Sequence, residues 1–206
     1  MHEYTVIKHP RHKVLFVLAG LSVFLSSVIS LLVNEAAVTF NLPVFIATFS
    51  ISGFTLFGFF YWLFNNFLWK TKFFCKMMKF PNLSGKWVCT AISNNIKEKK
   101  QYNWGSVITI TQCWDKILIV SKTTTSNSES QSVVGGINFV EGKGYEVSYH
   151  YNNTPNVTEK KLSKHEGFCV LCFSENLQTA EGYYFNNVKE RASYGEMNLR
   201  KEVSNV

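Results

Sequence analysis

Two stretches of the chain contain no charged residue, and they dominate its hydrophobic pattern. They cover residues 14–33 and 44–64, each about as long as the roughly 20 helical residues needed to cross the hydrocarbon core of a bilayer. Phe, Leu and Ile occupy every face of the second stretch, whereas a surface helix of a soluble protein keeps a polar side. We therefore predict two transmembrane helices, over residues 14–33 and 44–69.

Basic residues lie outside the predicted hairpin and not inside it. The segment between the spans, residues 34–43, holds Glu35 and no Lys or Arg. The flanks carry Lys8, Arg11, Lys13, Lys70, Lys72, Lys76 and Lys79. The positive-inside rule then predicts that both termini are cytoplasmic, with a basic tail over residues 1–13, a periplasmic loop over residues 34–43 and a basic juxtamembrane linker over residues 70–82. Phe and Met between the later lysines predict a short interfacial helix in that linker.

Small residues recur on both predicted spans. Ser22, Ser26 and Ser30 are spaced every four residues on the first span, and Gly53 and Gly58 lie on the second. Small side chains let two membrane helices approach closely. The same stripe serves packing within one hairpin and packing between copies, so the sequence leaves both interpretations open.

From Leu83 onward the pattern changes to short runs of Val, Ile, Thr, Tyr and Phe separated by Gly, Asn, Ser and Lys, which is typical of strands. We predict eight strands, over residues 85–92, 104–113, 116–124, 132–140, 145–152, 167–174, 179–185 and 195–203. Gly135 and Gly136 lie inside the fourth run, where glycine usually marks a bulge or a barrel corner. We expect an all-β domain over residues 83–206 that closes into an eight-stranded, up-and-down antiparallel barrel of the lipocalin kind.

Charge and motifs remove several function classes. The net charge is +7, but residues 80–206 hold 14 Lys and Arg against 12 Asp and Glu, so little of the excess belongs to the β domain. A protein that binds duplex nucleic acid needs a concentrated basic face, and we expect no such partner. The GxSxG, HExxH, P-loop and Rossmann signatures are missing, so we expect no enzyme.

The five cysteines form no disulfide framework, which fits a reducing compartment. Cys169 and Cys172 form a CxxC without a second pair at metal spacing, so we expect neither a metal site nor a cofactor. His150 or His165 could accompany one of these cysteines as a base beside a nucleophile. A hydrogen-bonded or solvated histidine is the simpler interpretation.

Aromatic and basic residues of the β domain are the candidate ligand contacts. Rings that could stack on a base are Trp87, Trp104, Tyr145, Tyr149, Tyr151 and Tyr183. Arg191 and Arg200 could meet a phosphate, for which the guanidinium has the right geometry. The alternative is that most of these rings simply fill the core of a small barrel.

Three short motifs follow the two spans: Leu83-x-Gly85-x-Trp87, Gly182-Tyr183-Tyr184 and Gly195-x-Met197-x-Leu199. With this layout, the chain resembles the two-transmembrane β-barrel effectors of bacterial CBASS anti-phage operons, the CD-NTase-associated receptors for cyclic nucleotides. The resemblance implies that a cyclic dinucleotide from a cognate CD-NTase binds the cytoplasmic barrel. It also implies that the protein forms a homo-oligomer, and that the spans then disrupt the lipid bilayer of the inner membrane and kill the infected cell.

A competing hypothesis is a membrane-tethered, lipocalin-like carrier of an apolar ligand, or a scaffolding subunit. A carrier predicts an apolar lumen without phosphate partners. A nucleotide receptor predicts stacked rings and at least one Arg or Lys that reaches a phosphate.

Overall fold

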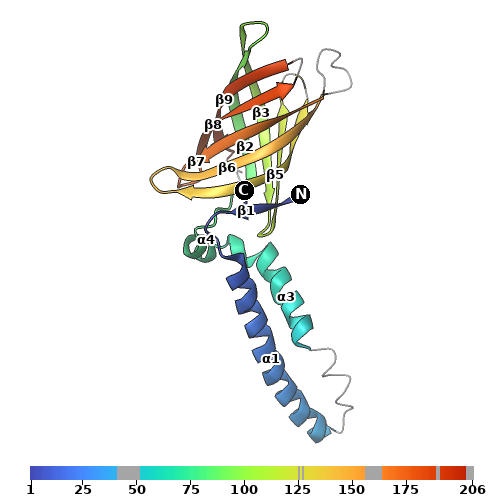
Figure 1. Ribbon diagram of the computed structural model, residues 1–206. Coiled ribbons are helices and arrows are strands. Elements are labelled where there is room, and N and C mark those ends of the chain that lie inside the picture. The colour runs from blue at the N-terminus through green and yellow to red at the C-terminus, as the bar shows by residue number, and fades with distance from the viewer. Residues whose placement is uncertain (41–51, 125, 127, 156–163, 189–190, 203–206) are drawn as a thin grey trace. The chain divides into compact units, whose positions relative to one another are not determined.

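The computed structural model describes residues 1–40, 52–124, 126, 128–155, 164–188 and 191–202 (Figure 1). These residues form two compact units. One is His9–Phe74, and the other combines Met1–Lys8 with Cys75–Val206. The first eight residues therefore belong to the β unit, although both predicted spans separate them from the rest of it in the sequence.

The helical unit contains α1 (Arg11–Phe40), α3 (Gly53–Asn66) and the 3-10 helix η1 (Leu68–Lys70), and α4 (Lys72–Met78) follows. Among the described residues, α1 is the one helix long and apolar enough to cross a membrane. Many of its exposed side chains are large and apolar, for example Phe16, which is 80% exposed. An apolar surface of this kind suits lipid better than water.

Helix α1 contains the predicted span 14–33 and continues to Phe40, so most of the predicted periplasmic loop is helical. The physical reason is local: residues 34–40 include Glu35, Ala36 and Ala37 and contain no Gly or Pro. Residues 41–51, which include the start of the second predicted span, lie outside the described part. The short helix expected after the second span is present as α4.

Gly53 is where α1 and α3 approach each other. A Cβ atom added at Gly53 would lie 3.7 Å from Ser26 Cβ and 3.8 Å from the carbonyl oxygen of Ser22. Ser22 is buried, and its hydroxyl donates to the Leu18 carbonyl at 2.6 Å. These three small residues therefore pack within one chain. A Cβ at Gly58 would have no atom within 4 Å, and a role for Gly58 and Ser30 between copies stays a prediction.

The β unit is a closed sheet of nine strands, so the predicted all-β class is confirmed and the predicted count of eight is wrong. The strands are β1 (His2–Val6), β2 (Gly85–Asn95), β3 (Lys100–Gln112), β4 (Lys116–Thr123), β5 (Glu129–Val140), β6 (Gly144–Thr154), β7 (His165–Phe173), β8 (Thr179–Val188) and β9 (Arg191–Lys201). Each predicted strand corresponds to one of β2–β9, and each of these pairs with its neighbour in the chain in antiparallel fashion. Strand β9 pairs with β2.

Strand β1 is the strand that sequence analysis missed, because residues 1–13 were expected to be a tail. β4 and β5 pair directly at Val120–Lys122 against Glu129–Gln131, and β1 then lies between them. It runs antiparallel to β4 and parallel to β5. We call the gap that β1 fills the β4–β5 slot. Residues 83–206 therefore close the barrel on their own only at these three residue pairs, and β1 fills the rest of the seam.

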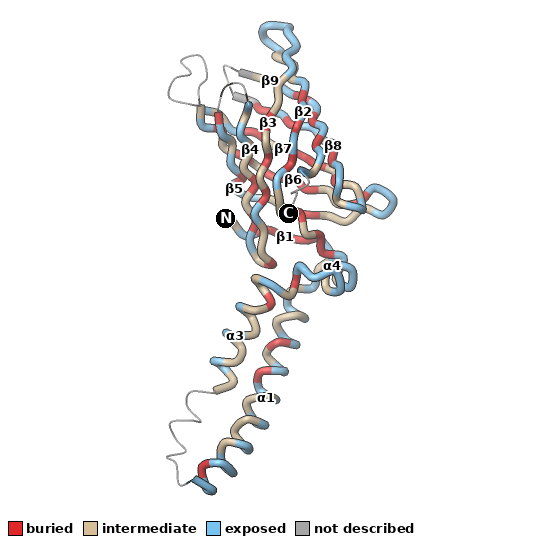
Figure 2. Tube along the Cα trace, turned by 180° about the vertical axis from the view of Figure 1, so that it is seen from behind, coloured by how far each residue is buried: buried red, intermediate tan, exposed pale blue. Residues whose placement is uncertain are grey.

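Buried and exposed positions alternate along the strands, as Figure 2 shows, because successive side chains of a strand point to opposite faces. Near the end where β3 turns into β4 and β7 into β8, the inward side chains are apolar. We call this the apolar half; it includes Trp87, Ile108, Ile110, Ile119, Ile137, Val147, Leu171 and Phe173, all at most 2% exposed. Trp87 packs edge-on against Phe173, with ring centroids 4.8 Å apart.

Candidate ligand site in the barrel lumen

The opposite end of the barrel holds a pocket between inward-facing side chains. This lumen pocket has a volume of about 240 Å³ and lies near the end where β2 turns into β3 and β4 meets β5. Its walls carry hydroxyl groups, aromatic rings, two amides and one imidazole. A concave site with a few convergent polar groups is where small ligands usually bind.

Three hydroxyl groups form a cluster on one wall. Thr123 Oγ1 lies 2.7 Å from Ser126 Oγ and 3.1 Å from Ser128 Oγ, and the two serine oxygens are 2.8 Å apart. Ser128 is 5% exposed. A hydroxyl both donates and accepts, so this hydroxyl cluster (Thr123, Ser126 and Ser128) can turn its hydrogen bonds toward a ligand.

Aromatic rings form much of the remaining wall. Trp104 and Tyr184 meet edge to face, with ring centroids 5.7 Å apart, and the centroids of Tyr149 and Tyr151 are 6.4 Å apart. Gly195 makes room for this arrangement, because a Cβ there would lie 2.6 Å from the Tyr184 ring. Faces of such rings can stack on nucleobases.

Amide and imidazole groups complete the site. Asn153 Nδ2 and His165 Nδ1 are 3.5 Å apart. Asn186 Oδ1 accepts from the backbone N–H and the hydroxyl of Ser193, both at 2.9 Å. These side chains can read the edge of a base, which presents donors and acceptors in a fixed pattern.

The base of the pocket is electrically neutral. Burial raises the pKa of Tyr149 well above its usual value, and the neighbouring Cys169 adds to this. Burial also raises the pKa of the Cys169 thiol to about 12. Both groups therefore stay protonated at physiological pH. No Lys, Arg, Asp or Glu is among the described residues that line the lumen pocket.

The structure brings three predicted ligand residues together: Trp104, Tyr149 and Tyr151 all line the lumen pocket. Of the two predicted arginine partners, Arg200 does not line the pocket. Arg200 is exposed on β9, on the opposite face from the lumen. The side chain of Arg191 lies outside the described part.

Three other rings that we predicted as ligand contacts lie outside the lumen pocket. Trp87 is fully buried in the apolar half, where its Nε1 donates to the Leu83 carbonyl at 3.1 Å, so no face is free for a base. Tyr145 sits near the apolar end, with its ring centroid 5.1 Å from that of Phe139. Tyr183 points outward and is 52% exposed. These rings serve packing or the outer surface.

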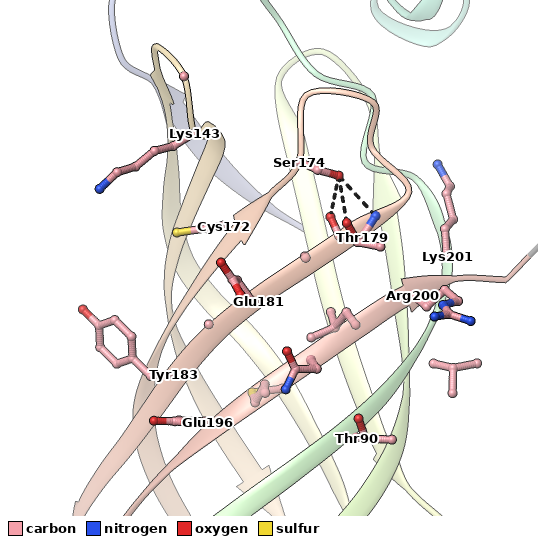
Figure 3. Close-up of a pocket in the computed structure, with 17 residues that line it drawn as sticks. Thr90, Lys143, Cys172, Ser174, Thr179, Glu181, Tyr183, Glu196, Arg200 and Lys201 are labelled. Atoms are coloured by element: carbon pink, nitrogen blue, oxygen red, sulfur yellow. Dashed lines mark hydrogen bonds between the residues drawn. The ribbon is translucent and has the colours of Figure 1, made fainter.

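Tyr183 and Arg200 instead line a broad groove on the outside of the sheet, of about 1260 Å³, along β7, β8, β9 and β2. Figure 3 shows its side chains spread along the strands, with hydrogen bonds between Ser174 and Thr179. Its basic residues share the groove with Glu181 and Glu196. The outer groove is therefore a mixed-charge surface, whereas the lumen pocket has converging walls.

Sequence analysis missed the hydroxyl groups. Ser126, Ser128, Ser130 and Ser132 alternate at the period of a strand, but the strands predicted over residues 116–124 and 132–140 leave residues 125–131 in the connection between them. In the structure β5 begins at Glu129, and Ser130 lines the lumen pocket. Period-two alternation of serine was the signal that could have identified an inward-facing polar row.

The sheet divides the cysteine and histidine candidates between its two faces, with His165 and Cys169 both on the lumen side. Cys169 is buried toward the lumen, whereas Cys172 lines the outer groove, because residues three apart on a strand face opposite sides. His150 forms an ion pair with Glu166 at 3.1 Å on the outer face. No group of three potential metal ligands occurs in the part of the chain that the structure describes.

Comparison with known proteins gives two family matches. Residues 78–201 match the family described as "Cap15, cyclic dinucleotide receptor domain", and residues 12–70 match "Cap15, TM helices". The chain is also 32% identical over 208 residues to CD-NTase-associated protein 15 of Yersinia aleksiciae, covering 97% of each chain. Together the two family matches cover most of the sequence.

Proposed function

Because the chain belongs to the Cap15 family of CBASS effectors, which pair a cyclic dinucleotide receptor domain with transmembrane helices, we propose that the lumen pocket is where the cyclic dinucleotide binds. Ligand binding then drives self-association, and the transmembrane helices of the assembled copies disrupt the inner membrane and kill the infected cell. The observation that carries this proposal is the polar, ring-lined lumen at one end of the barrel.

The chemistry of the pocket favours a nucleotide over an apolar ligand. Trp104, Tyr149 and Tyr151 offer ring surface to the bases, and Asn153 and Asn186 offer amides to their edges. The hydroxyl cluster offers donors to ribose and phosphate oxygens. In place of the arginine that we expected from the sequence, neutral donors receive the phosphates, which avoids burying a cation in the lumen. A pocket for an apolar ligand would not need a wall of hydroxyl and amide groups.

Membrane disruption is the task of the helices in this proposal. Two helices cannot enclose a pore, so several copies are needed to breach a bilayer. The basic flanks and the acidic residue between the spans favour cytoplasmic termini, which would let the barrel meet a cytoplasmic nucleotide. Small residues such as Ser30 and Gly58, the latter open in one chain, let helices of neighbouring copies approach.

Calorimetry on the full chain in detergent micelles tests the receptor step, with a panel of cyclic dinucleotides built from A, G, C and U. We expect micromolar or tighter binding of at least one member. If every member binds more weakly than millimolar while a fatty acid binds tightly, the carrier hypothesis replaces this one.

Dye release from vesicles of bacterial lipid tests the output. Adding the bound nucleotide to vesicles that contain the full chain is expected to release dye, and Gly58→Leu is expected to reduce release without changing nucleotide affinity. Cells that die with intact membranes, judged by propidium exclusion, would show that the helices are only an anchor.

A further inference from the structure

Strand β1 closes the barrel, although it precedes α1 in the sequence and the other strands follow the helices. It pairs with β4 at His2↔Ile117 and Glu3↔Lys116. It pairs with β5 at Tyr4↔Gly135, Thr5↔Gly136 and Val6↔Ile137. The closing strand is therefore joined to the first transmembrane helix by four residues, and not to the strands it completes.

The β4–β5 slot is shaped for the side chains of β1. Tyr4 and Val6 point inward and are 3% and 5% exposed. The Tyr4 hydroxyl donates to the Cys113 carbonyl at 3.1 Å and accepts from Gln112 Nε2 at 2.9 Å. On the outer face Glu3 stands opposite Lys116, a favourable cross-strand charge pair. The contacts of the slot therefore match the side chains of β1.

The attachment of β1 is nevertheless short. It covers five residues, and its longer contact is a parallel pairing with a β5 segment that contains Gly135 and Gly136. Parallel pairs are slightly less stable per residue than antiparallel ones, and glycine weakens a strand. The hinge after β1 is strained, because Lys8 has a φ of 67°. A strained hinge beside a closing strand favours exchange of that strand between copies.

Withdrawal of β1 leaves the polar half of the barrel closed, because β4 and β5 still pair at Val120–Lys122 and Glu129–Gln131. The exposed edges lie farther along both strands. Unpaired strand edges are templates for another strand. The occupant that matches the Tyr4 and Val6 positions, and the charge of Lys116, is β1 of a second copy.

We propose that β1 is exchanged between neighbouring copies, so that the strand of one copy completes the β4–β5 slot of the next. This inference rests on the assembly proposed above. Four extended hinge residues span at most about 14 Å, so exchange holds neighbouring copies close together. Head-to-tail exchange builds a ring or a row of copies, and a ring or a row supplies the many helices that disruption of a membrane requires.

The lumen pocket is connected to the slot through β5. Ser132 Oγ lies 2.8 Å from His2 Nε2, and Ser132 stands opposite Tyr151 in the sheet. Gly135, the partner of Tyr4, stands opposite Tyr149. A nucleotide that engages the two tyrosine rings therefore acts on the strand that holds β1, which gives the ligand a route to promote exchange.

Mixed single-cysteine variants, made in a chain whose five native cysteines are replaced by alanine, test the exchange directly. Full chains carrying Glu3→Cys and full chains carrying Lys116→Cys are reconstituted together in phosphatidylethanolamine–phosphatidylglycerol vesicles. The cyclic dinucleotide panel is added, and copper phenanthroline oxidises the thiols. We expect a disulfide-linked species of twice the chain mass on a non-reducing gel, rising severalfold with the activating nucleotide.

The matched control is a mixture of Lys122→Cys and Glu129→Cys chains. These exposed residues pair between β4 and β5 of one barrel, so their mixture is expected to give no dimer, whereas both substitutions in one chain give an internal cross-link. The Glu3→Cys/Lys116→Cys double variant in one chain verifies that the cross-link geometry is sound.

Absence of the mixed Glu3–Lys116 dimer overturns strand exchange, whether or not the vesicles leak. Leakage in the same vesicles reports the proposed function separately. Leaky vesicles without the dimer would mean that copies assemble while β1 stays in its own barrel. An equal dimer yield in the Lys122–Glu129 mixture would mean random collision, and would also overturn the proposal.

Discussion

The two halves of the barrel interior are built by the same strands and by the same inward alternation, yet they differ in what they can do. In the apolar half, Trp87 and Phe173 fill the lumen with no exposed surface. In the polar half, Trp104 and Tyr184 leave a pocket bordered by hydroxyl groups. Burial in the apolar half contributes much of the free energy of folding, and it forms the frame that positions the side chains of the polar half, where we propose that the ligand binds.

The largest expected effect comes from breaking the apolar half. Trp87→Ala removes a fully buried ring and is expected to lower the free energy of unfolding by about 3–5 kcal/mol. Urea unfolding of the full chain in micelles, followed by tryptophan fluorescence, measures it. Trp104→Ala, in the polar half, is the matched comparison and is expected to cost clearly less, because Trp104 is only half-buried. Equal losses would show that the two halves share one core.

Removing β1 tests whether the apolar half depends on a strand from outside the domain. The fragment Cys75–Val206 lacks Tyr4 and Val6, whose burial contributes about 1.5–3 kcal/mol each before the cost of ordering the strand. We expect this fragment to be less stable by a few kcal/mol than the same fragment with residues 1–8 attached through a flexible linker. Thermal unfolding compares the two. Identical transition temperatures would mean that the slot closes without β1.

Changes in the polar half are expected to act on affinity more than on stability. Trp104→Ala removes a stacking surface worth about 1–3 kcal/mol per base, which corresponds to roughly 5- to 150-fold weaker binding in calorimetry. Arg200→Ala is the control on the outer face and is expected to leave the affinity unchanged within about twofold. If Arg200→Ala weakens binding more than Trp104→Ala does, the ligand lies in the outer groove.

The smallest effect concerns pH. The pKa of Cys169 is about 12 in the folded barrel, against a usual value of 9.0, because burial disfavours the thiolate. The unfolded chain therefore loses this proton first, and the stability that depends on it falls as the pH rises from about 9 toward 12. Cys169→Ala is expected to flatten this decline in urea titrations at pH 8, 9 and 10. A decline as steep as that of the unmodified chain would assign alkaline sensitivity to other groups.

Local pattern was enough to predict much of the architecture. Uncharged length identified the first membrane helix, and runs of β-branched and aromatic residues identified the eight strands β2–β9. Strand ends at the polar half were predicted too short: β3 begins at Lys100 and not at Trp104. The reason is physical, because side chains that face a polar lumen lack the apolar alternation by which strands are recognised.

The rest depended on contacts that sequence spacing does not reveal. β1 is a five-residue segment beside a helix, and its partners lie far away in the chain. Of the eight predicted ligand residues, Trp104, Tyr149 and Tyr151 line the lumen pocket. Tyr183 points outward, because the direction of a ring depends on strand register, which an aromatic residue does not specify by itself. Trp87 points inward but lies in the apolar half.

The position of β1 also sets the order in which the molecule can be completed. His2 and Ser132 are 130 residues apart, so β1 leaves the ribosome well before its partner strand, by about 10 s at common rates of synthesis. Pairings between segments so distant in the chain form slowly. During this interval β1 is tethered to a helix that is already entering the membrane, and every new barrel passes through a stage with an open seam. Closure of that seam therefore competes with encounters among nascent chains, and we expect the yield of correctly closed barrels to fall as the rate of expression rises.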